Sequence, residues 1–106
     1  MCGVAAIFAY AEAAPPVERD ELLRIRDHMT SRGPDGEGEW LAADNRVGLG
    51  HRRLSIIDLS PTGAQPMFNE DRSLAIVYNG EVYNYRELRS QLSVRGYRFK
   101  SDLRYF

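Results

Sequence analysis

The only cysteine of the chain, Cys2, directly follows the initiator methionine, and this position offers a chemistry that an internal cysteine lacks. Removal of Met1, which a small second residue favours, makes Cys2 the N-terminal residue. Its α-amine has a reference pKa of about 7.7–8.0, so part of it is unprotonated at neutral pH and can accept the thiol proton. A terminal amine is an established base for a thiol nucleophile. Taken alone, a cysteine beside Gly3 at the start of a buried strand more often serves packing.

A second candidate for chemistry is the run Asn79-Gly80-Glu81. Asn-Gly after a β-type run normally indicates a hairpin turn. A helix pattern follows it, however, and a paired strand does not, which weakens that interpretation. Glycine lets the backbone approach a ligand closely. The Gly80 N–H and the Asn79 side-chain amide can therefore form an oxyanion hole, in which each donor typically contributes about 2.7–4 kcal/mol of transition-state stabilisation.

The third group is His51-Arg52-Arg53. Paired arginines usually form a solvated face or a surface ion pair. In a pocket, one planar guanidinium can clamp a carboxylate with two hydrogen bonds, which a lysine cannot do in the same orientation. His51 alone is more typical of a structural histidine than of a general base. The glycine pairs 36/38 and 48/50 are too short to indicate phosphate binding.

The elements that must position these residues follow from the hydrophobic pattern. The apolar run 3–9 predicts a buried strand, and Leu22, Ile25 and Met29 recur at helical spacing with charges between them. Asn84 and Glu87 have the spacing of a capping box. The pattern predicts two helices, one over 17–30 and one that begins at Asn84 and stops at Gly96. It also predicts strands near 39–42, 46–51, 74–78 and 97–100. Between them it predicts an extended segment at 54–59 and a loop over 60–72. These elements predict one α+β unit.

Composition and charge exclude several classes of protein. The chain has 106 residues, 43% of them apolar, which is enough for one modest core. A net charge of −1 gives no basic excess for a broad nucleic-acid footprint. No apolar run approaches the roughly 20 residues that span a bilayer, and no leader precedes the first strand, so a cytoplasmic location without membrane contact is the expectation. One cysteine and two histidines disfavour a metal site.

Taken together, the motifs resemble the glutaminase domain of the class II amidotransferases, in the N-terminal nucleophile hydrolase superfamily, and most closely the asparagine synthetase family. The resemblance covers nearly the whole chain in the right order and spacing. It rests on the segments Met1-Cys2-Gly3-Val4, Arg32-Gly33-Pro34-Asp35-Gly36, Gly50-His51-Arg52-Arg53-Leu54-Ser55-Ile56-Ile57-Asp58, Gln65-Pro66-Met67, Tyr78-Asn79-Gly80-Glu81-Val82-Tyr83-Asn84-Tyr85 and Leu88-Arg89.

This resemblance implies a role for each matching residue. Cys2 would be the nucleophile that attacks the side-chain amide of L-glutamine, releasing ammonia and leaving a thioester that water hydrolyses to glutamate. Asn79 and Gly80 would form the oxyanion hole. The substrate's carboxylate would bind Arg53. Glu81 and Asp102 match the acidic positions around its α-amino group.

The resemblance also implies a fold and a larger context. The family fold is an αββα sandwich of two antiparallel sheets, which needs a longer chain, so residues 1–106 are expected to be the N-terminal part of a type 2 glutamine amidotransferase domain. The tail Leu103–Phe106 departs from the family's pattern. The synthetase domain, to which ATP and Mg²⁺ would bind, is missing. No cofactor is expected in this segment, and a homodimer stays open.

Three functions remain open at this point. The first is glutamine hydrolysis that supplies ammonia for making asparagine from aspartate, or for another acceptor. The second is an inactive remnant, or a module that binds glutamine without turnover. The third is another N-terminal nucleophile hydrolase acting on an amide other than glutamine, for which the clamp at Arg53 would have no purpose.

Overall fold

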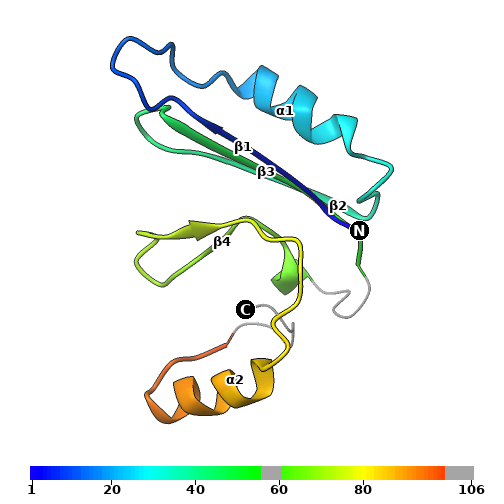
Figure 1. Cartoon of the computed structure of the whole chain (residues 1–106), viewed down its shortest axis with the longest axis vertical. Coiled ribbons are helices and arrows are strands. Elements are labelled where there is room, and N and C mark those ends of the chain that lie inside the picture. Colours follow the sequence, from blue (N-terminus) through cyan, green and yellow to red (C-terminus); the bar gives the residue numbers. More distant parts are fainter. Residues whose placement is uncertain (56–60, 100–106) are drawn as a thin grey trace.

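The computed structural model describes residues 1–55 and 61–99, which form helices and antiparallel sheets in an α+β arrangement, as predicted. Three longer strands come from the first half of the chain, and one helix lies between the first two of them (Figure 1). In chain order the elements are β1 (Gly3–Phe8), α1 (Arg19–His28), β2 (Gly36–Leu41), β3 (Val47–Arg53), a 3₁₀ turn (Pro61–Gly63), β4 (Met67–Phe68), β5 (Ala75–Ile76) and α2 (Tyr85–Val94).

The larger sheet has the strand order β1-β3-β2, and both of its pairings are antiparallel. Gly3 lies opposite Arg52 on one side of β3, and Gly36 lies opposite Arg53 on the other. The first strand of the chain therefore ends up as an edge strand, beside a strand that begins some 40 positions later. This arrangement brings the N-terminus to the end of β3.

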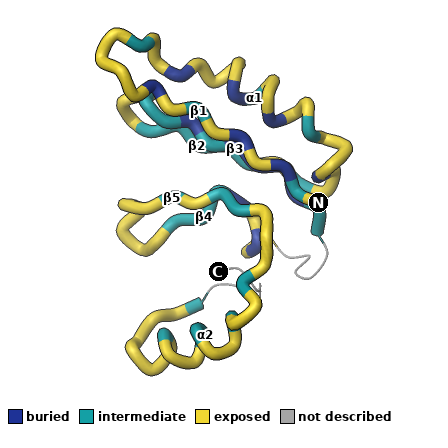
Figure 2. The backbone as a smooth tube through the Cα atoms, in the orientation of Figure 1, coloured by how far each residue is buried: buried dark blue, intermediate teal, exposed yellow. Residues whose placement is uncertain are grey.

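Helix α1 covers one face of this sheet and closes the main core (Figure 2). Leu22 of α1 is fully buried against the sheet, and Val17 and Ala5 are buried with it. A β-carbon at Gly48 would lie 2.9 Å from Val17 and 3.1 Å from Leu22, so the absence of a side chain there lets the helix approach β3. Gly48 thus serves the packing of α1 and the preceding segment on the sheet.

The apolar stripe predicted for α1 is only partly correct. Leu22 is buried and Met29 is half-buried, but Ile25 is 45% exposed. Arg26 is buried in its place, with its Cβ 3.3 Å from where a β-carbon would stand at Gly50. An arginine can occupy that position because its stem packs on the sheet while its guanidinium reaches acidic partners at the margin.

A second, smaller sheet pairs β4 with β5, so part of the predicted loop 60–72 is in fact ordered structure. Met67 pairs with Ile76 and Phe68 with Ala75. The ring of Phe68 contacts Trp40 of β2 with centroids 5.9 Å apart, which connects the small sheet to the larger one. The loop prediction was wrong here because two residues are too few for an alternating pattern to be visible.

Helix α2 lies apart from the larger sheet (Figure 1) and contains no buried residue. Its predicted start and stop are confirmed, since Asn84 is the N-cap residue and Gly96 takes a φ of +92° just after the helix. The predicted capping box is wrong, because the Asn84 side chain makes no cap hydrogen bond. With ψ at 27°, Asn84 lacks the extended conformation that directs a cap side chain at the next turn.

The two remaining expectations concern segments near the undescribed residues. Residues 97–99 form no strand, contrary to prediction, and Lys100 lies outside the described part. The extended segment predicted for 54–59 is described only at Leu54 and Ser55, neither of which belongs to a strand. An isolated β-type pattern needs a neighbouring strand, and α2 supplies no strand edge.

Candidate functional site

Cys2 lies half-buried at the N-terminal end of β1, where its sulfur meets the residue after β3. The Leu54 N–H donates to the Cys2 sulfur over 3.3 Å, and the thiol lies 3.8 Å from the Leu54 carbonyl oxygen. These contacts join residues 52 positions apart. The sulfur is therefore held by the backbone of the residue that directly follows β3.

The segment that holds the sulfur is in turn fixed by the turn between α1 and β2. The Ser55 N–H donates to the Asp35 carboxylate over 2.9 Å, and the Asp35 N–H donates to the Arg53 carbonyl over 2.9 Å. The run Arg32–Gly36 thus crosses the end of β3 and braces residues 53–55. Because Leu54 holds the Cys2 sulfur, this run also helps to fix the position of Cys2.

The two neighbouring arginines of β3 lie on opposite faces of the sheet, because side chains alternate along a strand. Arg52 is on the face covered by α1. Arg53 is on the other face, with its side chain beside Gly36, where a β-carbon would lie 3.5 Å from the Arg53 Cβ. Continuing the β1–β3 register by one residue beyond the Gly3–Arg52 pair sets Cys2 opposite Arg53. The candidate nucleophile and the candidate carboxylate clamp therefore share one end and one face of the sheet.

Arg52 belongs to a cluster of ion pairs with α1 and β2. Its guanidinium lies 2.7 Å from Glu37 and donates over 2.9 Å to the Gly33 carbonyl, and Arg26 lies 2.8 Å from Asp27 and 3.3 Å from Glu37. Hydrogen bonding to Asp27 raises the pKa of Arg26, and the same bond lowers the pKa of Asp27. This cluster satisfies the charge of Arg52 on the face covered by α1, whereas Arg53 lies on the opposite face, with Cys2.

His51 shares the face of Arg53 and is buried, with 1% of its surface exposed. Burial lowers its pKa; the main chain of Tyr78 opposes this shift, and the positive charge of Arg53 adds to it. A histidine with a lowered pKa is neutral at pH 7. Within residues 1–55 and 61–99, its Nε2 has no hydrogen-bond partner. The buried position agrees with the structural role expected from the sequence.

The candidate oxyanion residues, Asn79 and Gly80, lie exposed on the segment between β5 and α2. They do not form a hairpin, because the next element in the described part of the chain is α2 and not a strand that pairs with β5. Among the described residues, no hydrogen bond joins either of them to Cys2. Glu81 is exposed on the same segment, and its carbonyl accepts a hydrogen bond from the Tyr78 hydroxyl over 3.4 Å. Asp102 lies outside the described residues.

The sequence interpretation missed Gln65, whose side chain holds the strand end just before Asn79. Gln65 Nε2 donates to the Tyr78 carbonyl over 3.1 Å, and the Tyr78 N–H donates to Gln65 Oε1 over 2.6 Å. Gln65 is only 5% exposed. The only signal for it was its place in the Gln65-Pro66-Met67 segment of the family resemblance, because a lone glutamine in a loop has no periodicity to reveal burial.

Comparison with known proteins decides which family this arrangement represents. A family described as "Glutamine amidotransferase domain" matches residues 1–103. That is nearly the whole chain. The chain belongs to the glutamine amidotransferase domain family.

Individual relatives of this domain agree. Asparagine synthetase [glutamine-hydrolyzing] 1 of Bacillus subtilis is 43% identical over 103 residues, covering 96% of this chain and 16% of the relative. Amidase chry2 of Gibberella zeae is 41% identical over 101 residues, covering 88% of this chain and 15% of the relative. Asparagine synthetase [glutamine-hydrolyzing] 1 of Arabidopsis thaliana is 37% identical, covering 96% of this chain and 17% of the relative. The chain thus spans about a sixth of the length of these relatives.

Two further properties concern only residues 1–55 and 61–99. Neither α1 nor α2 has the length and apolar character needed to cross a membrane. No three side chains of histidine, cysteine, aspartate or glutamate come together there in a way that would hold a metal ion.

Proposed function

We propose that this glutamine amidotransferase domain hydrolyses the side-chain amide of L-glutamine, with Cys2 as the nucleophile. The observation that carries the proposal is the placement of the Cys2 sulfur, held by Leu54, at the same end and face of the sheet as Arg53. A thiol and a planar cation that are one strand apart match a substrate that carries a scissile amide and a free α-carboxylate.

The reaction would begin with transfer of the thiol proton to the α-amine of Cys2 after Met1 is removed. Met1 is exposed, so an aminopeptidase has access to it. The Cys2 thiolate attacks the amide carbon, and the carbonyl π electrons move to oxygen. Collapse of this tetrahedral intermediate breaks the C–N bond, and the nitrogen takes the proton back to leave as ammonia. Water then cleaves the γ-glutamyl thioester, giving glutamate and the free thiol.

The other residues would bind substrate or stabilise charge. Arg53 donates two hydrogen bonds to the α-carboxylate, and Glu81 and Asp102 accept hydrogen bonds from the α-ammonium group. The Asn79 side-chain amide and the Gly80 N–H donate to the oxyanion. Because α2 and the segment before it lie apart from the larger sheet, we further propose that the complete αββα sandwich includes chain beyond the described residues.

The ammonia acceptor is a separate question. The Bacillus and Arabidopsis relatives are named glutamine-hydrolysing asparagine synthetases, which favours aspartate as the acceptor and asparagine as the product. The Gibberella relative is named an amidase, which favours a different acceptor as the second candidate. We assign the use of ATP and Mg²⁺ to the part of the longer relatives that this chain does not span.

The central test is the rate of glutamine hydrolysis by the full natural protein and its Cys2→Ala variant. We expect glutamate release to fall to background in the variant, because alanine offers no nucleophile. The variant should keep the wild-type denaturation curve, which separates loss of chemistry from loss of folding. Hydrolysis that continues in a folded Cys2→Ala protein would disprove the proposal.

Two further assays test the specificity for glutamine and the identity of the ammonia acceptor. Simple amides without an α-carboxylate should be poor substrates, because Arg53 and the acidic residues cannot orient them. Comparable turnover of such amides would exclude the glutamine assignment while leaving a cysteine hydrolase. Formation of asparagine from aspartate, ATP and glutamine by the full natural protein decides between the two acceptors.

A further inference from the structure

Gln65 extends the small sheet with its side chain in place of its backbone. The β4–β5 pairing matches Met67 with Ile76, so the same register matches residue 65 with Tyr78. The intervening Pro66 has no N–H to donate to such a ladder. The Gln65 amide takes over, accepting from the Tyr78 N–H over 2.6 Å and donating to its carbonyl over 3.1 Å. Both main-chain polar groups of Tyr78 are therefore bound by one side chain.

The backbone of Gln65 is meanwhile seated on the larger sheet. A β-carbon at Gly38 of β2 would overlap the Gln65 carbonyl oxygen and would lie 2.9 Å from its carbonyl carbon. Gly38 lies opposite His51 in the β2–β3 register, on the face that also carries Arg53. Only glycine leaves room for this contact. Gln65 thus connects the rigid sheet to Tyr78 through one buried residue.

Tyr78 directly precedes Asn79 and Gly80, the candidate oxyanion donors. The Tyr78 ring lies over the next turn of the chain, since a β-carbon at Gly80 would be 2.6 Å from the Tyr78 hydroxyl oxygen. That hydroxyl donates to the Glu81 carbonyl. The orientation of Asn79 and Gly80 is thereby set from Tyr78, because the exposed pair has no described hydrogen bond of its own.

We propose that Gln65 is a positioning residue that holds the Asn79-Gly80 oxyanion donors in place, relative to the sheet that carries Cys2 and Arg53, before substrate binds. The inference rests on the proposed function and adds a residue to which the sequence interpretation assigned no role. Because an oxyanion donor stabilises charge that exists only in the transition state, Gln65 should influence kcat far more than substrate affinity.

The test compares Gln65→Met with the wild type in the full natural protein. Methionine has a similar length and no amide, so it removes both bonds to Tyr78 while filling most of the space. We expect kcat for glutamine hydrolysis to fall about 10- to 100-fold, as for a small misplacement of catalytic groups, with KM changed less than about threefold. The matched control is Gln91→Met on the exposed side of α2, which should leave both constants unchanged.

Two binding measurements distinguish positioning from a general structural effect. An aldehyde analogue of glutamine forms a tetrahedral adduct with the Cys2 sulfur and needs the oxyanion donors, whereas L-glutamate needs only the substrate contacts. Gln65→Met should weaken binding of the aldehyde in parallel with kcat and leave glutamate binding unchanged. Equal weakening of both ligands, or an unchanged kcat, would overturn the inference.

A second variant covers the case in which Gln65→Met does not fold. Gln65→Glu keeps the shape of the side chain, and its neutral carboxyl group can both accept from the Tyr78 N–H and donate to the Tyr78 carbonyl. Its kcat relative to the wild type should therefore rise as the pH is lowered; a ratio that stays constant with pH contradicts the inference. The Cys2→Ala experiment tests the nucleophile separately, so loss of hydrolysis there with normal kcat in both Gln65 variants would refute only the role of Gln65.

Discussion

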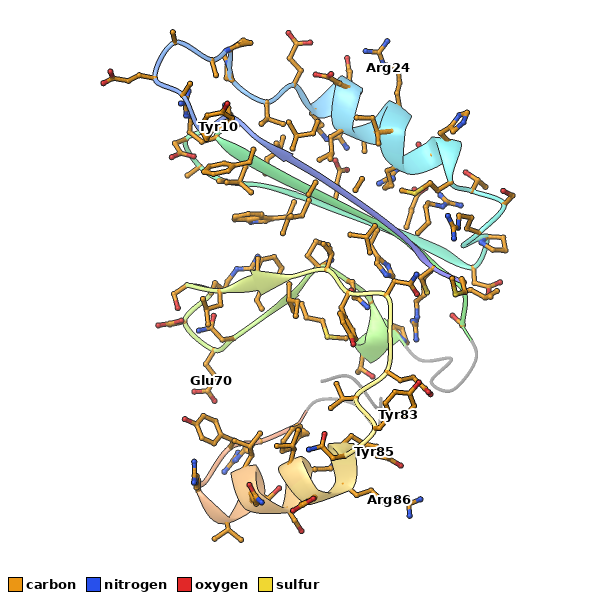
Figure 3. The ribbon with its side chains drawn as sticks, viewed as in Figure 1. Tyr10, Arg24, Glu70, Tyr83, Tyr85 and Arg86 are labelled. Atoms are coloured by element: carbon orange, nitrogen blue, oxygen red, sulfur yellow. The ribbon has the colours of Figure 1, made fainter. Side chains whose placement is uncertain are left out.

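The half of the chain that contains the β1-β3-β2 sheet and the half that contains α2 differ in what holds them. In the first, α1 buries Leu22 against the sheet, and two buried arginines are neutralised by acidic partners. In the second, α2 buries no residue, and Tyr83 just before it is 91% exposed (Figure 3). The proposed nucleophile and carboxylate clamp are in the first half, and the proposed oxyanion donors are in the second.

This difference shows which contacts fix the position of each part of the proposed site. Cys2 and Arg53 are placed by strand register, which many backbone hydrogen bonds enforce together. Asn79 and Gly80 depend on side-chain bonds to the preceding residue, Tyr78: two from Gln65 and a main-chain hydrogen bond with His51. A site built in this way has one rigid part and one part that a single substitution can displace.

The largest effect expected from the comparison is on stability and follows from Leu22→Ala. Leu22 is fully buried between α1 and β3, so its truncation should lower the free energy of unfolding by about 2–5 kcal/mol, the range for leucine in a packed core. Leu92→Ala on α2 is the matched variant, because Leu92 is only half-buried. Leu92→Ala should lower the free energy of unfolding by about 1 kcal/mol or less. Urea denaturation of the full natural protein measures both.

Equal losses for the two leucines would contradict the contrast between the halves. A larger loss for Leu92 would mean that α2 is packed in solution against chain that the described residues do not include. Hydrogen exchange of the α2 amides would then show protection comparable to that of β3, which separates this outcome from a simple error about Leu22.

A smaller effect is expected from Glu37→Gln. Glu37 binds the guanidinium groups of both Arg26 and Arg52, but its own side chain is 59% exposed and Asp27 remains as a partner. We therefore expect a loss of about 1–2 kcal/mol, between a screened surface pair and a fully buried one. Glu70→Gln, on the exposed turn between β4 and β5 (Figure 3), should change stability by less than about 0.5 kcal/mol.

The denaturation midpoint at low and high salt adds a second measurement for this pair of variants. The wild-type protein should lose stability as salt screens the Glu37 contacts, and Glu37→Gln should reduce that dependence. Identical salt dependence in the two proteins would show that the cluster contributes no net charge interaction.

The smallest effect is expected from Asn84→Ala at the start of α2. An N-cap side chain typically contributes about 1 kcal/mol, but the Asn84 side chain makes no such bond. The substitution should therefore change the stability of α2 by less than about 0.5 kcal/mol, measured from the exchange rates of its amide protons. A loss of about 1 kcal/mol or more would show that the capping box predicted from the sequence forms in solution after all.

Local patterns in the sequence were sufficient for most of the elements. The apolar run before Phe8 predicted β1, the spacing around Leu22 predicted α1, and Gly96 predicted the end of α2, because each signal depends on residues within a few positions of one another. The predicted strand 74–78 contains β5, but the same signals failed for the two-residue strand β4 and for 97–99, where pairing with another strand decides the outcome.

By itself, the sequence determined that a thiol and an α-amine belong to one residue once Met1 is removed, because that is a matter of covalent order. It also contained the motifs that place the chain in its family. Only the tertiary structure decided which of the two neighbouring arginines faces Cys2, and that Gln65 holds Tyr78. The reason is that strand register and packing join residues 13 to 52 positions apart, and no local pattern records which of them will meet.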